Sequence, residues 1–301
     1  MSRWTRIVRW FDSTAELNSE AGSTIDWLRV IPFIGMHLAC FAVFWVGWSP
    51  LAVTVAVTLY LVRMFAITAF YHRYFSHRAF RTSRALQFVF AVIGASAVQR
   101  GPLWWAGHHR HHHAHADDPE DVHSPRDGFL WSHVGWFLIS ENFAARTRNV
   151  RDLARFPELR FLDRFDAFVP VLLAAMLFAV GSVLRRTAPQ LEVSGSQLLV
   201  WGFFISTVVL YHATFTVNSL AHRFGTRRFP TPDDSRNNFW IALLTLGEGW
   251  HNNHHRCPGA ARQGFRWWEI DLTYYALRLL ASIGLIWDLR PIPAHLRDRK
   301  R

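Results

Sequence analysis

Cysteine is scarce in this chain, with two residues among 301. Cys40 lies inside an apolar block and Cys257 follows a histidine cluster, so their positions indicate no disulfide framework. The zinc-protease motif H-E-x-x-H is absent, and the sequence contains no zinc-finger or RNP-type signature. The chain therefore does not fit a disulfide-rich secreted scaffold, and nothing in it points to a nucleic-acid partner.

Acidic residues are also few. The 22 Asp and Glu stand against 33 Lys and Arg, which gives a formal net charge of +11. A basic balance suits a nucleic acid, an anionic membrane face or an anionic substrate. Half of the residues are hydrophobic, and arginines flank the apolar blocks. These observations favour the lipid bilayer as the partner.

Four apolar blocks are long enough to cross the roughly 30 Å hydrocarbon core of a bilayer as helices. They cover about residues 31–48, 51–70, 168–184 and 198–217. The turn between the first two carries no charge, whereas most arginines lie before the first block, between the second and third, and after the fourth. The positive-inside rule predicts cytoplasmic termini and a cytoplasmic long loop, in a bacterium on the inner membrane.

Most of the 17 histidines gather in the two predicted cytoplasmic regions, 71–165 and 218–301. They form the groups His72-Arg-Tyr-Phe-Ser-His77, His108-His109-Arg110-His111-His112-His113 and His251-Asn-Asn-His254-His255, with Asn218 and His222 at the end of the fourth block. All four groups are expected at one membrane face, because the second and fourth spans run in the same direction. We predict an all-α integral membrane protein, one domain over residues 1–301, with four transmembrane helices and a cytoplasmic helical cap holding a histidine-rich site.

The histidine spacing is typical of a metal centre. H-x-x-H-H puts side chains at i, i+3 and i+4, which share one face of a helix. Imidazole is a neutral ligand for iron, copper or zinc. One catalytic zinc takes about three protein ligands and a water, so some nine histidines from four segments fit two ions better. Iron is favoured over zinc because an apolar substrate brought by the membrane needs redox chemistry.

The three boxes H-x-x-x-x-H, H-R-x-H-H and H-x-x-H-H resemble the membrane acyl-CoA desaturase family of the stearoyl-CoA desaturase type, in its bacterial delta-9 form. Further stretches similar to that family are Gly128–Trp136, Val217–Gly225 and Gly247–His255. The resemblance covers roughly residues 65–287.

The resemblance implies two irons held by histidines of all three boxes and by the extra histidine after the fourth span. Carried over by position, these ligands are His72, His77, His109, His112, His113, His222, His251, His254 and His255. Asn218 matches a family residue that reaches one iron through a water. The second box has two registers, because His108, His111 and His112 also read H-x-x-H-H. We choose the later one, in which Arg110 directly follows the first histidine as in the family.

The resemblance also implies oxygen-dependent insertion of a cis double bond, in the family near the ninth carbon, into a saturated long acyl chain. No cytochrome or ferredoxin motif is fused to the chain, so a separate electron donor of ferredoxin, rubredoxin or cytochrome b5 type is expected. Animal relatives carry a basic pair for coenzyme A where this chain has Ser140-Glu141. Acyl-CoA and phospholipid-linked acyl chains therefore both stay open as substrates, with Arg227, Arg228 and Arg236 as candidate head-group contacts.

Two rival functions are open at this point. A histidine-box hydroxylase of a lipid or alkane shares the chemistry, but the Asn-Ser-x-x-His and Gly-Glu-Gly-x-His stretches favour desaturation. A membrane metal transporter would place ionisable ligands within several spans, whereas these histidines lie at the predicted cytoplasmic end.

The acidic residues near the boxes receive two different interpretations. Glu248, Glu269 and Asp271 are placed to accept hydrogen bonds from the outer nitrogens of ligating histidines. The run Asp117, Asp118, Glu120 and Asp121 is predicted to be solvated. Arg63 lies within the second span, where it would either extend toward the interface or pair near the site.

Overall fold

A computed structural model describes residues 8, 11–13 and 24–297. The α-helices are α2 (Trp27–Cys40), α3 (Val43–Val46), α4 (Pro50–Phe65), α5 (Arg84–Ala95), α6 (Pro102–His115), α7 (Phe129–His133), α8 (Arg151–Ala154), α9 (Pro157–Arg164), α10 (Phe168–Thr187), α11 (Gly195–Leu198), α12 (Ser206–Ser219), α13 (Phe239–Leu244), α14 (His251–Arg256), α15 (Leu272–Ser282) and α16 (Ala294–Arg297). Two π-helices, η1 (Ala66–Ser76) and η7 (Leu199–Ile205), continue α4 and precede α12.

Short 3₁₀ turns and one small strand pair complete the described chain. The 3₁₀ turns are η2 (Pro125–Asp127), η3 (Gly135–Leu138), η4 (Ser140–Asn142), η5 (Thr147–Val150), η6 (Pro189–Leu191) and η8 (Leu220–His222). Strand β1 (Arg81–Thr82) pairs antiparallel with β2 (Ile286–Trp287), with Arg81 opposite Trp287. The mostly helical architecture agrees with the sequence prediction.

Three helices are long and apolar enough to cross a membrane, namely Pro50–Ser76, Phe168–Thr187 and Gly195–His222. They correspond to the second, third and fourth predicted spans, and the first and last of them run several residues further. The first predicted span falls on the shorter pair α2 and α3, which a turn at Phe41 and Ala42 separates. The four-span count therefore stays a prediction.

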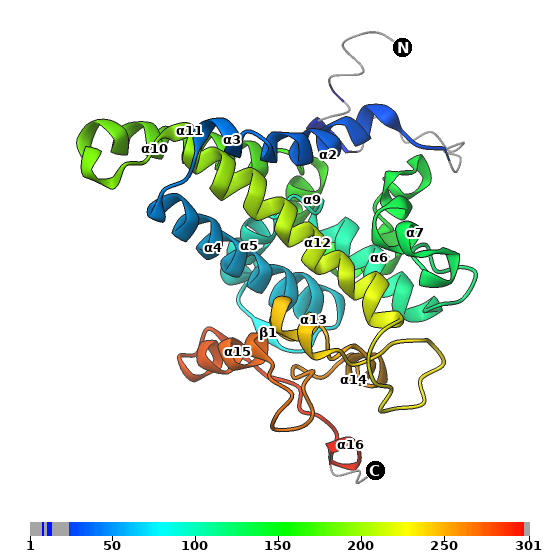
Figure 1. The fold of residues 1–301 in the computed structure, drawn as a ribbon. Helices are drawn as coiled ribbons and strands as arrows, with labels where there is room; N and C mark the ends of the chain where they lie inside the picture. Colours follow the sequence, from blue (N-terminus) through cyan, green and yellow to red (C-terminus); the bar gives the residue numbers. More distant parts are fainter. Residues whose placement is uncertain (1–7, 9–10, 14–23, 298–301) are drawn as a thin grey trace.

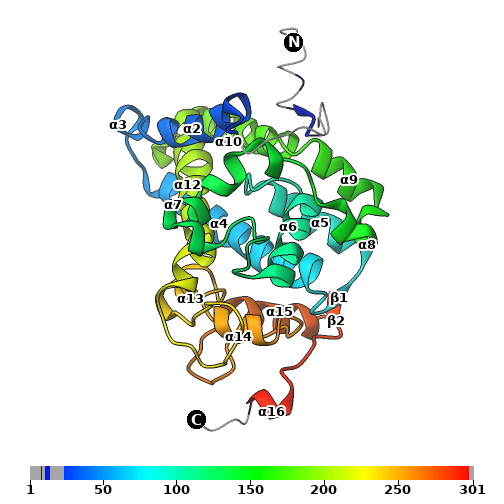
Figure 2. The same ribbon diagram turned by 90° about the vertical axis from the view of Figure 1, so that its right-hand side faces the viewer.

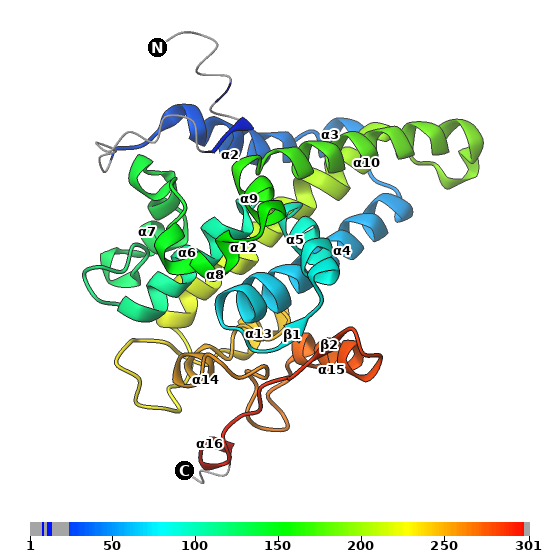
Figure 3. The same ribbon diagram turned by 180° about the vertical axis from the view of Figure 1, so that it is seen from behind.

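The helices are arranged so that α4 and α12 connect opposite ends of the molecule. Helices α2, α3, α10 and α11 lie together at one end, and α13, α14 and α15 lie at the other (Figure 1). Helices α4 and α12 run obliquely between these ends and pack on each other (Figures 1 and 2). Seen from behind, α5, α6, α8 and α9 cover one side of this pair (Figure 3). The histidine-bearing ends of α4 and α12 thus approach α6 and α14.

Arg63 is buried in the middle of this helix pair, with 1% of its surface exposed. Its guanidinium donates to Thr207 Oγ1 at 2.7 Å and to Ser206 Oγ at 2.6 Å, both on α12. It also donates to the carbonyl of Ser96 at 3.2 Å. The charge neither extends to an interface nor reaches the histidines, and it ties α4 to α12 through neutral oxygens instead.

The Arg63 contacts predict a loss of stability on truncation. Hydrogen bonds to charged groups contribute about 1.5–3 kcal/mol each, so Arg63→Ala should lower the free energy of unfolding by about 3 kcal/mol or more. Denaturant titration in detergent micelles measures it. Arg185→Ala, at the exposed end of α10, is the matched control and should change little. Equal effects of both substitutions would contradict the assignment.

The arginine distribution predicts the side on which each end of the chain lies. Reporters fused at Met1 and Arg301, both outside the described residues, should report the cytoplasm. Trp48 is 69% exposed, and the thiol introduced by Trp48→Cys should react with an impermeant reagent from the opposite side. The background variant would have both native cysteines replaced by serine. A non-cytoplasmic report from either terminus would rule out the four-span arrangement.

Candidate metal centre

The nine histidines singled out in the sequence converge in two adjacent clusters. Cluster one consists of His72, His77, His109, His113 and His254, and cluster two of His112, His222, His251 and His255. Within each cluster one ring nitrogen from every residue lies within 4.8 Å of all the others. Both clusters are groups that could hold a metal ion.

A π-helix explains the H-x-x-x-x-H spacing of the first box. In η1 the backbone bonds from residue i to i+5, and the bond from His77 N to His72 O, at 3.3 Å, follows this pattern. Residues five apart therefore come onto one face, which an α-helix would not achieve. The two rings lie 4.9 Å apart between centroids. Local widening of the helix thus places both histidines in cluster one.

The second and third boxes each contribute to both clusters. Helix α6 supplies His109 and His113, at i and i+4, to cluster one, and His112 to cluster two. Helix α14 does the reverse, because His254 belongs to cluster one while His251 and His255 belong to cluster two. Helices α6 and α14 therefore each border both clusters.

The nitrogen spacing fits a metal ion in each cluster. In cluster one, Nε2 of His254 lies 3.0 Å from that of His72 and 2.9 Å from that of His113. In cluster two, Nε2 of His251 lies 3.0 Å from those of His222 and His255. Two nitrogen atoms that each lie about 2.1 Å from one metal ion, at right angles to each other, would be about 3 Å apart.

Burial favours the neutral form of five cluster imidazoles, the form that binds a metal ion. Desolvation is the largest cause that lowers the pKa of all five well below the usual 6.5, with neighbouring histidines adding to it. These five are His77, His109, His113, His251 and His254. Their unprotonated nitrogens are available to bind a cation.

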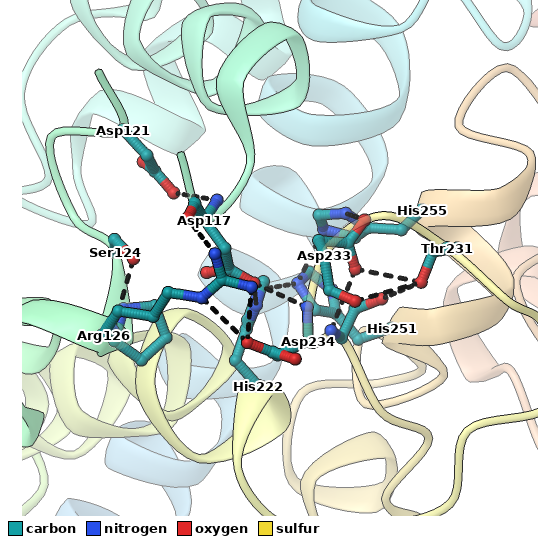
Figure 4. A network of polar contacts seen from close by, with 12 residues as sticks. Asp117, Asp121, Ser124, Arg126, His222, Thr231, Asp233, Asp234, His251 and His255 are labelled. Carbon is teal, nitrogen blue, oxygen red and sulfur yellow. Dashed lines mark hydrogen bonds and ion pairs between the residues drawn. The ribbon is translucent and has the colours of Figure 1, made fainter. Parts of the chain in front are cut away.

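Buried aspartates hold three histidines of cluster two by the outer nitrogen. Nδ1 of His112 donates to Asp121 at 2.9 Å, that of His222 to Asp117 at 3.0 Å, and that of His255 to Asp233 at 3.1 Å. Figure 4 shows Asp117 near His222 and Asp233 near His255. Such bonds fix the ring orientation and raise the basicity of the inner nitrogen.

The three carboxylates are ionised despite being only 2–3% exposed. Burial alone would raise the pKa of each, but the histidine partners and backbone or side-chain donors hold it below the usual value. Asp121 also accepts from His123 N, while Asp233 accepts from Ser235 N at 2.9 Å. A further possible metal group, His112 with Asp121 and His123, is therefore interpreted as support for cluster two.

Cluster one has a different polar surround. Glu248 accepts from His72 Nδ1, and Arg73 donates to the same carboxylate at 3.0 Å. Arg73 is itself buried and also pairs with Asp271. Burial would raise the pKa of Glu248, but His72 and Arg73 lower it. One carboxylate, already paired with an arginine, thus supports this cluster.

An apolar cavity of about 720 Å³ leads to both clusters. Its walls include Phe33 and Met36 of α2 and Ala174 and Phe178 of α10, together with residues of η3 and η7. At the metal-site side the lining includes His72, His109, His251 and Asn218. A long apolar molecule in this cavity would lie against the cluster nitrogens.

A polar group is fixed in one wall of the cavity beside cluster one. Gln99 donates to Thr214 Oγ1 at 2.8 Å and accepts from Trp105 Nε1 at 3.3 Å. The Trp105 ring in turn stacks on His109 with centroids 5.0 Å apart. Val98 and Arg100, on either side of Gln99, have positive φ of 60° and 68°. Such strain in non-glycine residues persists only where the surroundings impose it, and the wall is therefore rigid.

Comparison with known proteins agrees with this geometry. The fatty acid desaturase family profile matches residues 25–284. This chain belongs to the fatty acid desaturase family. The family is generally iron-dependent and membrane-associated, which suits the histidine clusters and the three apolar helices. The sequence-based recognition is confirmed, and the desaturase is an oxidoreductase.

Three similar proteins illustrate the range of the family. The sn-1 stearoyl-lipid 9-desaturase of Anabaena variabilis is 38% identical over 92% of this chain and 96% of its own. The acyl-CoA 5-desaturase AL21 of Anemone leveillei is 38% identical over 92% of this chain and 83% of its own. The palmitoyl-monogalactosyldiacylglycerol delta-7 desaturase of Arabidopsis thaliana is 39% identical over 92% and 71%. Similar chains thus differ in acyl carrier and in bond position.

The remaining histidines of the desaturase lie outside the two clusters. His108 contacts the Ala144 carbonyl at 3.2 Å and His111 the Glu120 carbonyl at 2.8 Å. His37, His212 and His133 form a hydrogen-bonded row, with nitrogen distances of 3.1 and 3.0 Å. The geometry therefore favours the register His109, His112 and His113 for the second box.

The candidate head-group arginines do not line the cavity. Arg227 donates to the carbonyls of Thr231 and Asp233 and so holds the loop that carries Asp233. Arg228 lies 3.6 Å from Glu269, and Arg236 donates to the Gly225 carbonyl at 3.4 Å. Their contacts stabilise the loop between α12 and α13, and Arg227 supports the metal centre indirectly.

Sequence reasoning misjudged some of the acidic residues, although Asp118 and Glu120 are exposed as expected. Asp117 and Asp121 were expected to be solvated and are buried against histidines, because the chain after α6 turns back over cluster two. Asp233 was missed, since nothing in its local sequence sets it apart. Glu248 does contact a histidine as expected, whereas Asp271 pairs with Arg73 and Glu269 accepts from Asn253.

The two registers of the second box make opposite predictions for metal content. His109→Ala and His113→Ala should each lose about one iron per chain, because their nitrogens lie in cluster one. His108→Ala and His111→Ala should retain the iron, since their rings bond to backbone carbonyls. Iron is counted by mass spectrometry on purified protein, with membrane expression checked for each variant. The reverse result would establish the earlier register.

Proposed function

We propose that this desaturase introduces a cis double bond into a saturated long acyl chain, with O₂ as co-substrate and water as product. The observation that carries the proposal is the apolar cavity that ends on both histidine clusters. Hydrocarbon fits such walls, and the two adjacent clusters could hold a pair of redox metal ions beside it.

The metal ions would be two irons. His72, His77, His109, His113 and His254 would hold one, and His112, His222, His251 and His255 the other. Asn218, which lines the cavity about one helical turn before His222, would reach the second iron through a water. Bound irons would supply the oxygen chemistry that an unactivated C–H bond requires.

The protein's own part is to position the chain and keep the cavity dry. The side chains of α2 and α10 enclose the apolar part, which removes water from the site. The rigid wall around Gln99 and Trp105 fixes where a bound chain passes cluster one. Holding two adjacent methylenes against the metal centre would set the bond position. We propose the delta-9 position, as in the relative from Anabaena variabilis.

The acyl carrier would be coenzyme A or a membrane lipid, and relatives of both kinds are known. Arg100, which lines the cavity, lies 3.2 Å from Asp166 and donates to the Phe143 carbonyl at 2.8 Å. This cation is already paired, which fits a neutral or zwitterionic carrier at least as well as a polyphosphate. Electrons would come from a separate ferredoxin-, rubredoxin- or cytochrome b5-type protein, and the site would face the cytoplasm of a bacterium.

Metal content and product identity test the proposal together. The purified protein should carry two irons per chain, because the two clusters provide two sets of nitrogen ligands. A host that expresses it should gain a cis-monounsaturated acyl chain, identified by mass spectrometry resolved by lipid class. The inactive His254→Ala variant is the control. A hydroxylated product would instead identify a hydroxylase, and activity supported by zinc alone would contradict the iron chemistry.

The cavity wall predicts which chain lengths are accepted. Ala174→Phe adds a ring to the wall on α10, and overpacking costs about 1–3 kcal/mol. Activity on the longest chains should fall by about one to two orders of magnitude, with shorter chains affected less. Met176→Phe, on the exposed face of the same helix, is the matched control. An equal loss for all chain lengths would contradict binding in this cavity.

A further inference from the structure

The outer hydrogen bonds of the two clusters are unequal. Three of the four histidines of cluster two donate Nδ1–H to a buried aspartate, at 2.9 to 3.1 Å. In cluster one the same kind of contact joins His72 to Glu248. Among the residues that the structure describes, no second carboxylate forms a hydrogen bond or ion pair with a cluster-one imidazole.

The cations around these carboxylates increase the difference. The guanidinium of Arg73 forms ion pairs with both Glu248 and Asp271, so a cation directly offsets part of the charge of the carboxylate beside cluster one. Beside cluster two, Arg126 donates at 2.8 Å to the backbone carbonyl of Asp117, and Arg227 to that of Asp233. These two arginines pair with the carboxylate of Asp234 rather than with the carboxylates that hold the histidines.

The aspartates beside cluster two are bound mainly by neutral donors. Asp117 accepts from Asp234 N at 2.7 Å, Asp121 from Asp117 N at 3.0 Å, and Asp233 from Ser235 N at 2.9 Å. Neutral donors stabilise an anion without cancelling its charge. Three negative charges therefore act on cluster two through its imidazoles in a buried environment, where electrostatic interactions are strong.

We propose that the two metal positions are electronically unequal, and that Asp117, Asp121 and Asp233 stabilise the ferric state at cluster two. A metal ion held by cluster one would then accept the first electron from a one-electron reductant, and a metal ion held by cluster two would accept the second. Each step converts one Fe³⁺ to Fe²⁺. The inference rests on the iron binding proposed above, and it makes the three aspartates positioning residues that set the order of reduction.

A redox titration tests the order. Protein loaded with ⁵⁷Fe is reduced stepwise with dithionite and mediators, and Mössbauer spectra count ferrous iron at each potential. We expect two steps of one iron each. If the equilibrium constants of the two reduction steps differ tenfold, their potentials differ by about 59 mV, since each is a one-electron couple. A single step that reduces both irons together would overturn the proposal.

Substitutions that keep shape and remove charge assign each step to a cluster. Asp121→Asn and Asp233→Asn should each raise the equilibrium constant of the second reduction step about tenfold. The equilibrium constant of the first reduction step should stay unchanged. Glu248→Gln should move the first step instead. Asp234→Asn is the matched control, because that carboxylate contacts Arg126 and Arg227 and no cluster imidazole; neither step should move. Equal movement of both steps in Asp233→Asn would overturn the proposal.

Iron content is measured on every variant before titration. If one aspartate variant loses its iron, the other and Glu248→Gln still test the order, since they act on different histidines. A wild-type protein with fewer than two irons would contradict the proposed function itself. Two irons that reduce in one step would contradict only the unequal positions, and the two failures are therefore distinguishable.

Discussion

The structure depends on the convergence of nine imidazoles from four distant segments. Their Nε2 atoms approach to about 3 Å in both clusters, where, without a cation, neutral nitrogens would gain little from meeting. The surrounding fold supports this arrangement with the π-helix η1, the buried side chain of Arg73 and four buried carboxylates. Each of these costly features is oriented toward the clusters, directly or through one neighbour, and together they pre-organise a site that metal ions would complete.

Two of the helices that are long and apolar enough to cross a membrane also lead to histidines of the clusters. Helix α4 continues into η1 and carries His72 and His77, while α12 continues into η8 and carries His222. Arg63 fixes these two helices to each other through Ser206 and Thr207. The separation of the clusters therefore depends on how two long helices pack. The apolar cavity lies beside these helices, and its lining includes histidines of both clusters.

The buried acids give the two clusters different characters within one fold. The loop after α6 supplies Asp117 and Asp121, and the loop after α12 supplies Asp233, so both loops close over cluster two. Cluster one instead borders Arg73, which forms an ion pair with Glu248 and offsets part of its charge. Similar ligands in dissimilar electrostatic surroundings are a way for one protein to give two metal ions separate roles.

Local sequence was enough to predict the class of the molecule and its candidate metal ligands, because histidine spacing and apolar length are local properties. Three of the four predicted spans coincide with apolar helices of sufficient length, and the nine histidines meet as two groups. Tertiary structure alone decided the division of the ligands between clusters, since α6 and α14 each serve both. It also decided the roles of Asp117, Asp121 and Asp233. A carboxylate is buried by chain segments that pack over it. These segments are distant in the sequence, so the residues next to the carboxylate do not predict its burial.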